Sequence, residues 1–265
     1  MSGSLARVAA MVLRYWYLLR GSWSRLFDLM FWPAIMMVLW GFISSFLATN
    51  SSWVARASGV LLSAVMLWDI LFRGELGYSI SFLEEIWSRN LGHLFVSPLR
   101  PGELVVALMG ISVIRTLIGV VPALVVAIPL FAFNIFDLGP PLIAFFVNLL
   151  VTGWALGAMV TALLLLVGMG AENIAWFAIF LLAPIACIYY PVSALPFWLQ
   201  PVALAFPMAY VFEGMRAALF EHVFRLDLML AAAGLNVIYL GIGIASFFYA
   251  FRRARVTGAL FQTGE

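Results

Sequence analysis

The chain has 265 residues, of which 65% are hydrophobic, 15% aromatic and only 10% charged. Soluble globular domains contain about 45–50% apolar and about 25% charged residues, so this chain lacks the charges that would cover a water-facing surface. Its formal net charge of +2 excludes the strongly basic face that is typical of nucleic-acid-binding proteins. We therefore expect an all-α membrane protein with membrane lipid around it and no nucleic-acid partner.

Several enzyme classes are excluded by residues that the sequence lacks. All 14 basic residues are arginines, so the chain has no lysine for a P-loop nucleotide site or a Schiff base. Cys187 is the single cysteine, and His93 and His222 are too far apart in the sequence to show metal-ligand spacing. We expect no catalytic residue, metal site or cofactor on this chain, and the shortage of these residues argues against a membrane-embedded enzyme.

Six segments are long and apolar enough to cross the hydrocarbon core, which takes about 20 residues. The predicted spans are residues 26–48, 57–83, 104–133, 140–169, 173–190 and 228–251. Six is an even number, so both termini should lie on one side of the membrane. Under this arrangement nine arginines lie on the side of the termini and three on the other side. By the positive-inside rule, both termini are expected in the cytoplasm, and the start of the chain is not a cleavable signal peptide.

Two segments outside the spans are predicted to be amphipathic helices. Residues 4–23 place apolar side chains on one stripe and arginines on another, which is typical of an interfacial helix in the headgroups. Residues 84–97 follow the second span and should form a short cytoplasmic helix, which Pro98 ends. This second helix either rests on lipid or docks a cytosolic partner and passes force into the two spans beside it.

A third unusual segment, residues 191–220, precedes the last span on the predicted outer side. It is apolar, but prolines recur every five or six residues, which a straight spanning helix does not tolerate. Irregular backbone at membrane depth persists only within protein or beside water, so we expect re-entrant helices here rather than a hydrated extracellular loop. In its second limb, Glu213 and Arg216 have the spacing of an i, i+3 ion pair.

Ionisable residues inside the spans need partners, because each costs roughly 2.5–3.5 kcal/mol on insertion scales. Asp69 and Arg73 have the i, i+4 spacing of an ion pair. Glu75 could bind Arg115 of the third span, or Arg115 could extend to the cytoplasmic headgroups instead. Neither arrangement resembles a proton relay.

The layout resembles the permease subunits of ATP-binding-cassette exporters of the second type, over nearly the whole chain. Three segments carry the resemblance: RYWYLLRGSWSRLFDLMFWPAIMMVLWGF near the start, FLEEIWSRNLGHLFVSPLRPGEL between spans two and three, and PVSALPFWLQPVALAFPMAYVFEGMR before span six. The middle segment is the most specific, since in such permeases it is the coupling helix that the ATPase receives.

The resemblance implies roles for two sets of residues. The ATPase-coupling residues would be Glu84, Glu85, Trp87, Arg89, Leu91, His93 and Phe95. The outer gate would comprise Pro191, Pro196, Trp198, Pro201, Pro207, Glu213 and Arg216. It also implies two copies of a separate cytosolic ATPase, which would bind ATP and Mg, and a second permease, as a homodimer or a heterodimer.

The expected function is therefore ATP-driven export across the bacterial inner membrane. The substrate could be a glycan, a lipid-linked compound or a hydrophobic drug-like molecule, and the sequence does not choose among them. The alternative is a secondary transporter driven by an ion gradient. That class usually has internal repeats and midplane ion-binding groups, and we find no convincing repeat between residues 26–133 and 140–251.

Overall fold

The computed structural model describes residues 2–50, 52–168 and 172–257, and these residues are almost entirely helical. The long helices are α1 (Ser2–Arg20), α2 (Trp23–Asn50), α3 (Ser52–Trp87), α5 (Pro101–Phe131), α6 (Pro141–Val167) and α10 (Leu226–Thr257). The shorter ones are α4 (Leu91–Val96), η1 (Ile135–Leu138), α7 (Glu172–Leu182), η3 (Val192–Ala194), α8 (Gln200–Leu204), α9 (Pro207–Arg216) and η4 (Ala217–Glu221).

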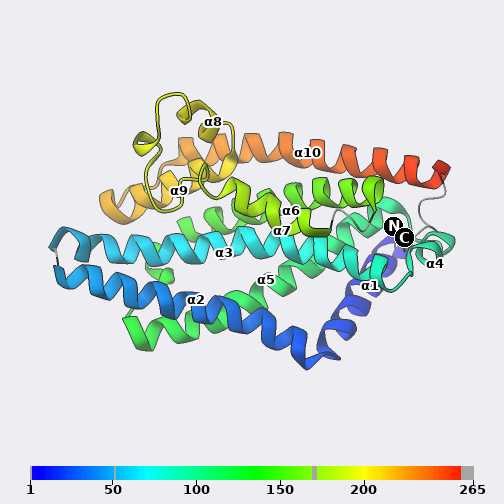
Figure 1. Ribbon diagram of the computed structural model, residues 1–265, viewed down its shortest axis with the longest axis horizontal. Helices are drawn as coiled ribbons and strands as arrows, with labels where there is room; N and C mark the ends of the chain where they lie inside the picture. The colour runs from blue at the N-terminus through cyan, green and yellow to red at the C-terminus, as the bar shows by residue number, and fades with distance from the viewer. Residues whose placement is uncertain (1, 51, 169–171, 258–265) are drawn as a thin grey trace.

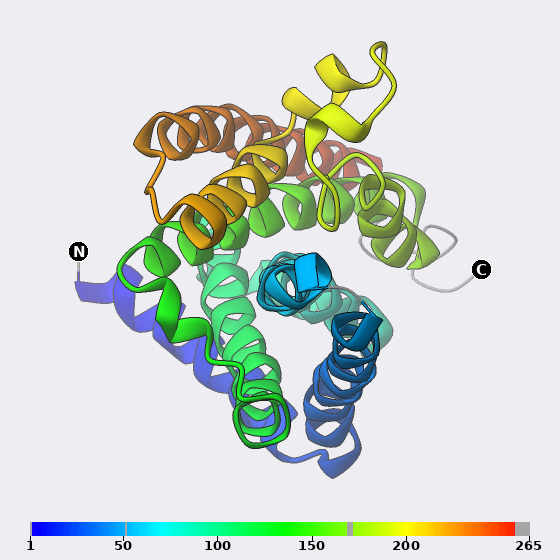
Figure 2. The same cartoon turned by 90° about the vertical axis from the view of Figure 1, so that its left-hand side faces the viewer.

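Helices α2, α3, α5, α6 and α10 run along the long axis of a bundle (Figure 1). Helix α3 lies at its centre and contacts α2, α5, α6, α7 and α9 (Figure 2). The C-terminal end of α10 lies at the same end as α1 and α4, and we call this the α4 end. The opposite end carries α8, α9 and the turn between α2 and α3, and we call it the α8 end.

Within the described residues, four helices are long and apolar enough to cross a membrane, namely α2, α5, α6 and α10. They correspond to the predicted spans 26–48, 104–133, 140–169 and 228–251, although residue 169 lies outside the described part. Helix α3 contains the predicted span 57–83 and is 36 residues long, but it is not among these four. An all-helical membrane protein is thus confirmed, while the count of six spans stays a prediction.

The prediction of a continuous helix over residues 173–190 is wrong. Helix α7 ends at Leu182, and its 11 residues are about 16 Å long, roughly half the thickness of the hydrocarbon core. Pro184 lies just beyond α7 and cannot donate a backbone hydrogen bond, although α2 and α5 continue through prolines of their own. Beyond it, Cys187 adopts a left-handed backbone with φ 55°, and the chain turns.

Most of the core forms two apolar clusters, one toward each end of the bundle, and a small third cluster contains Cys187, Ala203 and Ala209. Along α3 the first cluster ends at Leu71 and the second begins at Tyr78; along α5 the corresponding limits are Val120 and Ile111. A belt of buried polar side chains lies in α3 and α5 between the clusters. Its members are Arg73, Glu75, Ser112, Arg115 and Thr116.

Glycines let the helices meet closely at this belt. A Cβ added to Gly153 would lie 2.8 Å from the backbone nitrogen of Glu75, and one added to Gly157 would lie 2.9 Å from Tyr78. The sequence GWALG at residues 153–157 thus brings α6 against α3, as a small-xxx-small pattern does in membrane helices. On the other side of α3, Gly119 leaves room for the guanidinium of Arg73.

Buried polar side chains hold α10 against α6. The amide of Asn236 donates to the backbone oxygen and to Oδ1 of Asn148, each at 3.0 Å, and its own Oδ1 accepts from Thr152 at 2.8 Å. In α10, Asn236 is only 3% exposed, so its amide has no access to water and needs these partners. Sequence analysis gave no signal for this cluster.

Candidate functional site

Helix α1 is held against α3 and α5 by arginine ion pairs as well as by its apolar face. Arg7 forms an ion pair with Glu103 at the start of α5, at 2.5 Å, and Ser4 donates to the same carboxylate at 2.7 Å. Seven residues later, about two turns along the same helix, Arg14 forms an ion pair with Glu85 at the end of α3. Next to Arg14, Tyr15 is fully buried, and burial raises the pKa of its phenol well above the ordinary value. These ion pairs form a strap that holds helix α1 to the α3–α4–α5 connection.

A second ionic cluster joins α2, α3 and α5 at the α4 end. Arg115 donates to Oε1 of Glu84 at 2.8 Å, and Arg25 donates to the same oxygen at 3.2 Å. Glu84 and Arg115 are both buried, whereas Arg25 is exposed. Two arginines thus share one carboxylate, which leaves this cluster with one excess positive charge.

Both interpretations of Arg115 from the sequence are wrong. Arg115 does not bind Glu75, and it does not extend to the headgroups, because it is buried against Glu84. Glu75 is fully buried, and its Oε1 accepts a hydrogen bond from Ser79 at 3.0 Å. Sequence analysis considered only Glu75 as an acidic partner of Arg115, because it had assigned Glu84 to the cytoplasmic docking helix. The expected Asp69–Arg73 pair is present, at 2.6 Å.

The expected helix over residues 84–97 is split by a turn. Helix α3 continues through Trp87, and Arg89 then adopts a left-handed backbone with φ 52°. The backbone nitrogens of Arg89 and Asn90 donate to the carbonyls of Ile86 and Glu85, which is the hydrogen-bond pattern of a Schellman C-cap. This cap usually contains glycine. Because an arginine occupies the position here, sequence analysis did not detect the turn.

The short helix α4 follows this turn and ends where the sequence predicted. Leu91 and Leu94 face inward and are buried, while His93 and Val96 are exposed. Ser97 has an extended backbone, as the residue before Pro98 should. The side chain of Phe95 lies outside the described residues.

The two acidic residues expected on the docking surface are inside the protein. Glu84 is 8% exposed and Glu85 only 1%, and both are engaged by arginines of this chain. They therefore position the α3–α4 turn rather than face a partner. The surface available at this end consists of exposed side chains on the turn and on α4, namely Trp87, Ser88, Arg89, His93, Val96 and Ser97.

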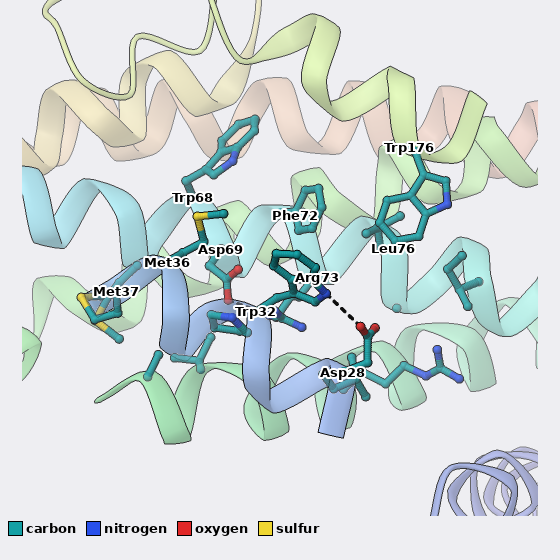
Figure 3. A pocket seen from close by; sticks show the side chains of 18 of the residues that line it. Asp28, Trp32, Met36, Met37, Trp68, Asp69, Phe72, Arg73, Leu76 and Trp176 are labelled. Atoms are coloured by element: carbon teal, nitrogen blue, oxygen red, sulfur yellow. Dashed lines mark hydrogen bonds and ion pairs between the residues drawn. The ribbon is translucent and has the colours of Figure 1, made fainter. Parts of the chain in front are cut away.

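A cavity of about 650 Å³ opens between α2, α3, α5 and α7. Eight aromatic side chains line it, and five of them belong to the ten tryptophans of the chain: Trp32, Trp40, Trp68, Trp87 and Trp176. Glu84, Arg115 and Arg25 line it too, so the cavity reaches the ionic cluster at the α4 end. Figure 3 shows Asp28, Trp32, Asp69, Arg73 and Trp176 around it. Sequence analysis did not find this cavity, because its walls come from segments far apart in the chain.

At the α8 end, the predicted re-entrant segment divides into an exposed and a buried part. Pro191, Pro196, Trp198 and Pro201 are exposed, whereas Pro207 begins the buried helix α9. The expected Glu213–Arg216 pair is present at 3.1 Å. Arg216 also donates to the carbonyl of Cys187 at 2.9 Å, and Glu213 accepts from the backbone nitrogen of Val192 at 2.6 Å. The pair thus fastens the segment that follows α7.

The comparison with protein families decides what kind of protein has this arrangement. The family model of the ABC-2 type transporter matches residues 7–220, which include α1, the α3–α4–α5 connection, the cavity and α9. The chain belongs to the ABC-2 type transporter family. A search of curated proteins found no match. As an ABC-2 permease, the chain is a multi-pass membrane component of an ABC transporter, and the family association agrees with the resemblance noted in the sequence.

In an ABC-2 permease, two features of this structure bear on transport: the α3–α4 turn and the cavity. The turn is partly exposed and is held in place by the ion pairs of α1. The cavity is lined by aromatic side chains and reaches Glu84 and Arg115, which lie beside the turn. Because Glu84 belongs to both, a displacement of the turn would also displace a wall of the cavity.

Proposed function

We propose that this ABC-2 permease is the transmembrane subunit of an ATP-driven exporter. The observation that carries the proposal is the continuity between the α4 turn and the cavity through Glu84, which binds Arg115 at 2.8 Å and lines the cavity. Such a connection lets mechanical work done at the turn change the shape of the chamber. Export, rather than import, follows from the family resemblance alone.

The proposal places the α4 end in the cytoplasm of a bacterial cell, at the inner membrane. The arginine distribution supports this orientation, since α1, α4 and the C-terminal end of α10 lie at one end of the bundle and nine of the 14 arginines lie in or near these segments. The chain then crosses the membrane six times: α2, α3, α5, α6 and α10 provide five crossings, and α7 with the irregular segment after it provides the sixth. Stacking of Tyr189 on Trp40, with ring centroids 4.9 Å apart, supports this course of the segment.

The proposal assigns ATP and Mg to a separate ATPase subunit, present in two copies. That subunit would contact the exposed side of the α3–α4 turn, with Arg89, His93 and Val96 at the centre. A second permease, the same chain or a similar one, would complete the transport path. Helix α2 supports this role, because many of its apolar side chains are exposed, including Phe31, Trp32, Leu39 and Phe42.

The experiment reconstitutes the permease with its nucleotide-hydrolysing partner in lipid vesicles and measures ATP hydrolysis and transport together. Charge reversal of the turn by Arg89→Glu with His93→Glu should uncouple hydrolysis from transport while the permease still folds. The matched control is Arg225→Glu, since Arg225 is exposed directly before α10 and pairs locally with Asp227 at 2.7 Å. Equal coupling in both variants would contradict the proposal.

A further inference from the structure

The cavity changes in chemistry along its length. Along α2, the lining residues run from Arg25 and Asp28 at the α4 end to Met36, Met37 and Trp40 deeper in the bundle. Along α3 they run from Glu84 to Met66 and Val65 in the same direction. Figure 3 shows the methionines at one side of the cavity and Asp28 toward the other, with Arg73 and Asp69 between them. One end of the cavity is therefore charged and the other is apolar.

The lining has few uncharged polar groups for sugar hydroxyls, namely the Tyr189 hydroxyl and the indole N–H groups of its tryptophans. Among the described residues that form the cavity wall there is no Ser, Thr, Asn, Gln or His. Most of the charged groups already bind one another, so few donors and acceptors remain for a chain of sugar hydroxyls. Burying unpaired hydroxyl groups costs free energy, which disfavours a glycan in this chamber. An apolar chain, by contrast, fits the aromatic and methionine-lined part.

The charges at the polar end do not pair one to one. Arg25 and Arg115 share Glu84, and this leaves one positive charge in excess. Arg115 Nε and Glu84 Oε2 are buried and have no hydrogen-bond partner in the described structure. Both residues line the cavity, but these two atoms are enclosed by protein, so a bound head group would meet the excess positive charge of the cluster rather than these atoms.

Asp28 supplies the opposite charge close by. It lies three residues after Arg25 on α2, so the two side chains are neighbours on one face, about 5–6 Å apart at Cβ. In the described residues Asp28 forms no ion pair; its Oδ1 accepts a hydrogen bond from Nε1 of Trp32 at 2.9 Å. A carboxylate beside an indole ring is a favourable site for an organic cation. The polar end thus offers an excess positive and an excess negative site side by side.

We propose that the cavity binds a zwitterionic amphiphile, with the anionic part of its head at Arg25 and Arg115 and the cationic part at Asp28 and Trp32. Its apolar chain lies among Met36, Met37, Trp40 and Trp68. This assignment rests on the proposed function, because it names the substrate class for the same cavity. A head group with charge of only one sign would leave either the arginines or Asp28 without an oppositely charged partner.

The experiment measures binding to the purified permease alone, in amphipol, by the change in tryptophan fluorescence. Three probes share a dodecyl chain and differ in the head: dodecylphosphocholine, dodecyl phosphate and dodecyltrimethylammonium, all below their critical micelle concentrations. Maltohexaose serves as the glycan probe. We expect the phosphocholine to bind about fivefold or more tightly than either probe whose head carries charge of only one sign, which corresponds to one added charge contact, and maltohexaose not to bind.

Two variants test each half of the head site. Asp28→Asn should remove the advantage of the phosphocholine over the phosphate, while Arg25→Gln should remove its advantage over the ammonium. Both residues are exposed, so neither substitution should prevent folding, which a thermal unfolding curve checks. Asp227→Asn is the matched control, because that carboxylate is exposed and lies outside the cavity lining.

Equal binding of the three dodecyl probes, binding of maltohexaose, or an unchanged ranking in Asp28→Asn would each overturn the zwitterion assignment. Binding without any ATPase also separates the two proposals. A permease that ranks the probes as expected but is not coupled to ATP hydrolysis would contradict the proposed function alone. A coupled transporter with no preference among the heads would contradict only the substrate class.

Discussion

Glu84 and Arg115 are 31 residues apart in the sequence and meet as a buried ion pair at 2.8 Å. The pair joins the end of α3 to the interior of α5, and Arg25 of α2 binds the same carboxylate oxygen. Three long helices therefore meet at one oxygen atom directly before the α3–α4 turn. This junction is the structural basis for coupling between the turn and the cavity.

Removal of Arg115 should destabilise the permease strongly. Arg115→Met leaves Glu84 buried with only the exposed Arg25, and breaking a buried pair in this way costs about 3–5 kcal/mol. Thermal unfolding in detergent measures the loss. The double substitution Arg115→Met with Glu84→Gln should recover part of it, because no uncompensated buried charge remains. Full stability of the single variant would show that the pair does not hold the helices.

The strap between α1 and α3 gives a local prediction. Arg14→Ala exposes no new core but leaves Glu85, which is 1% exposed, without its cation. Arg14 itself is 36% exposed, so the cost should fall below that of a fully buried pair. We expect amide hydrogen exchange in α1 to become roughly tenfold faster. Arg20→Ala on the same helix is the control, since Arg20 is exposed, and equal exchange in both variants would argue against the strap.

The polar contact between α6 and α10 should contribute a moderate amount of stability. Asn236→Leu removes the hydrogen bonds to Asn148 and Thr152. Hydrogen bonds between membrane helices contribute about 0.6 kcal/mol on average and up to about 2 kcal/mol, so we expect a loss within this range. Steric-trap or detergent unfolding of the variant measures it. An increase in stability would mean that the amide is retained for another reason.

Close packing of α6 on α3 makes Gly153 intolerant of a side chain. In Gly153→Ala, the new methyl group would lie 2.8 Å from the backbone nitrogen of Glu75, so the helices must separate. We expect a lower melting temperature and a disturbed belt around Glu75. Gly241→Ala on α10 is the matched control, because open space surrounds that position and alanine favours the helix by about 1 kcal/mol. If the two variants melt alike, the close approach of α6 and α3 is not needed for stability.

Local rules predicted most of the long helices and the short-range ion pairs. The hydrophobic runs located α2, α5, α6 and α10, and helical spacing found the Asp69–Arg73 and Glu213–Arg216 pairs. Pro98 correctly ended α4, since a residue before proline is driven to an extended backbone. These features depend on residues within a turn or two of one another.

The errors arose where distant segments decide the outcome. Glu84 and Glu85 look like exposed residues of an amphipathic helix until arginines from α1, α2 and α5 are brought to them. The turn at Arg89 was missed because its left-handed backbone uses an arginine where glycine is usual. The helix over 173–190 was predicted from apolar composition, which does not show that the chain leaves the helix after Leu182.

The most direct test of the account asks what the α3–α4 turn touches. Cys187 is the only cysteine and is buried, so an introduced cysteine provides the accessible thiol. Val96→Cys at the α4 end and Phe197→Cys near α8 replace side chains that are 84% and 87% exposed. With a thiol-to-amine cross-linker, the account predicts that the Val96→Cys permease is joined to the ATPase subunit and the Phe197→Cys permease is not. Cross-linking of the ATPase at position 197, and none at position 96, would contradict it.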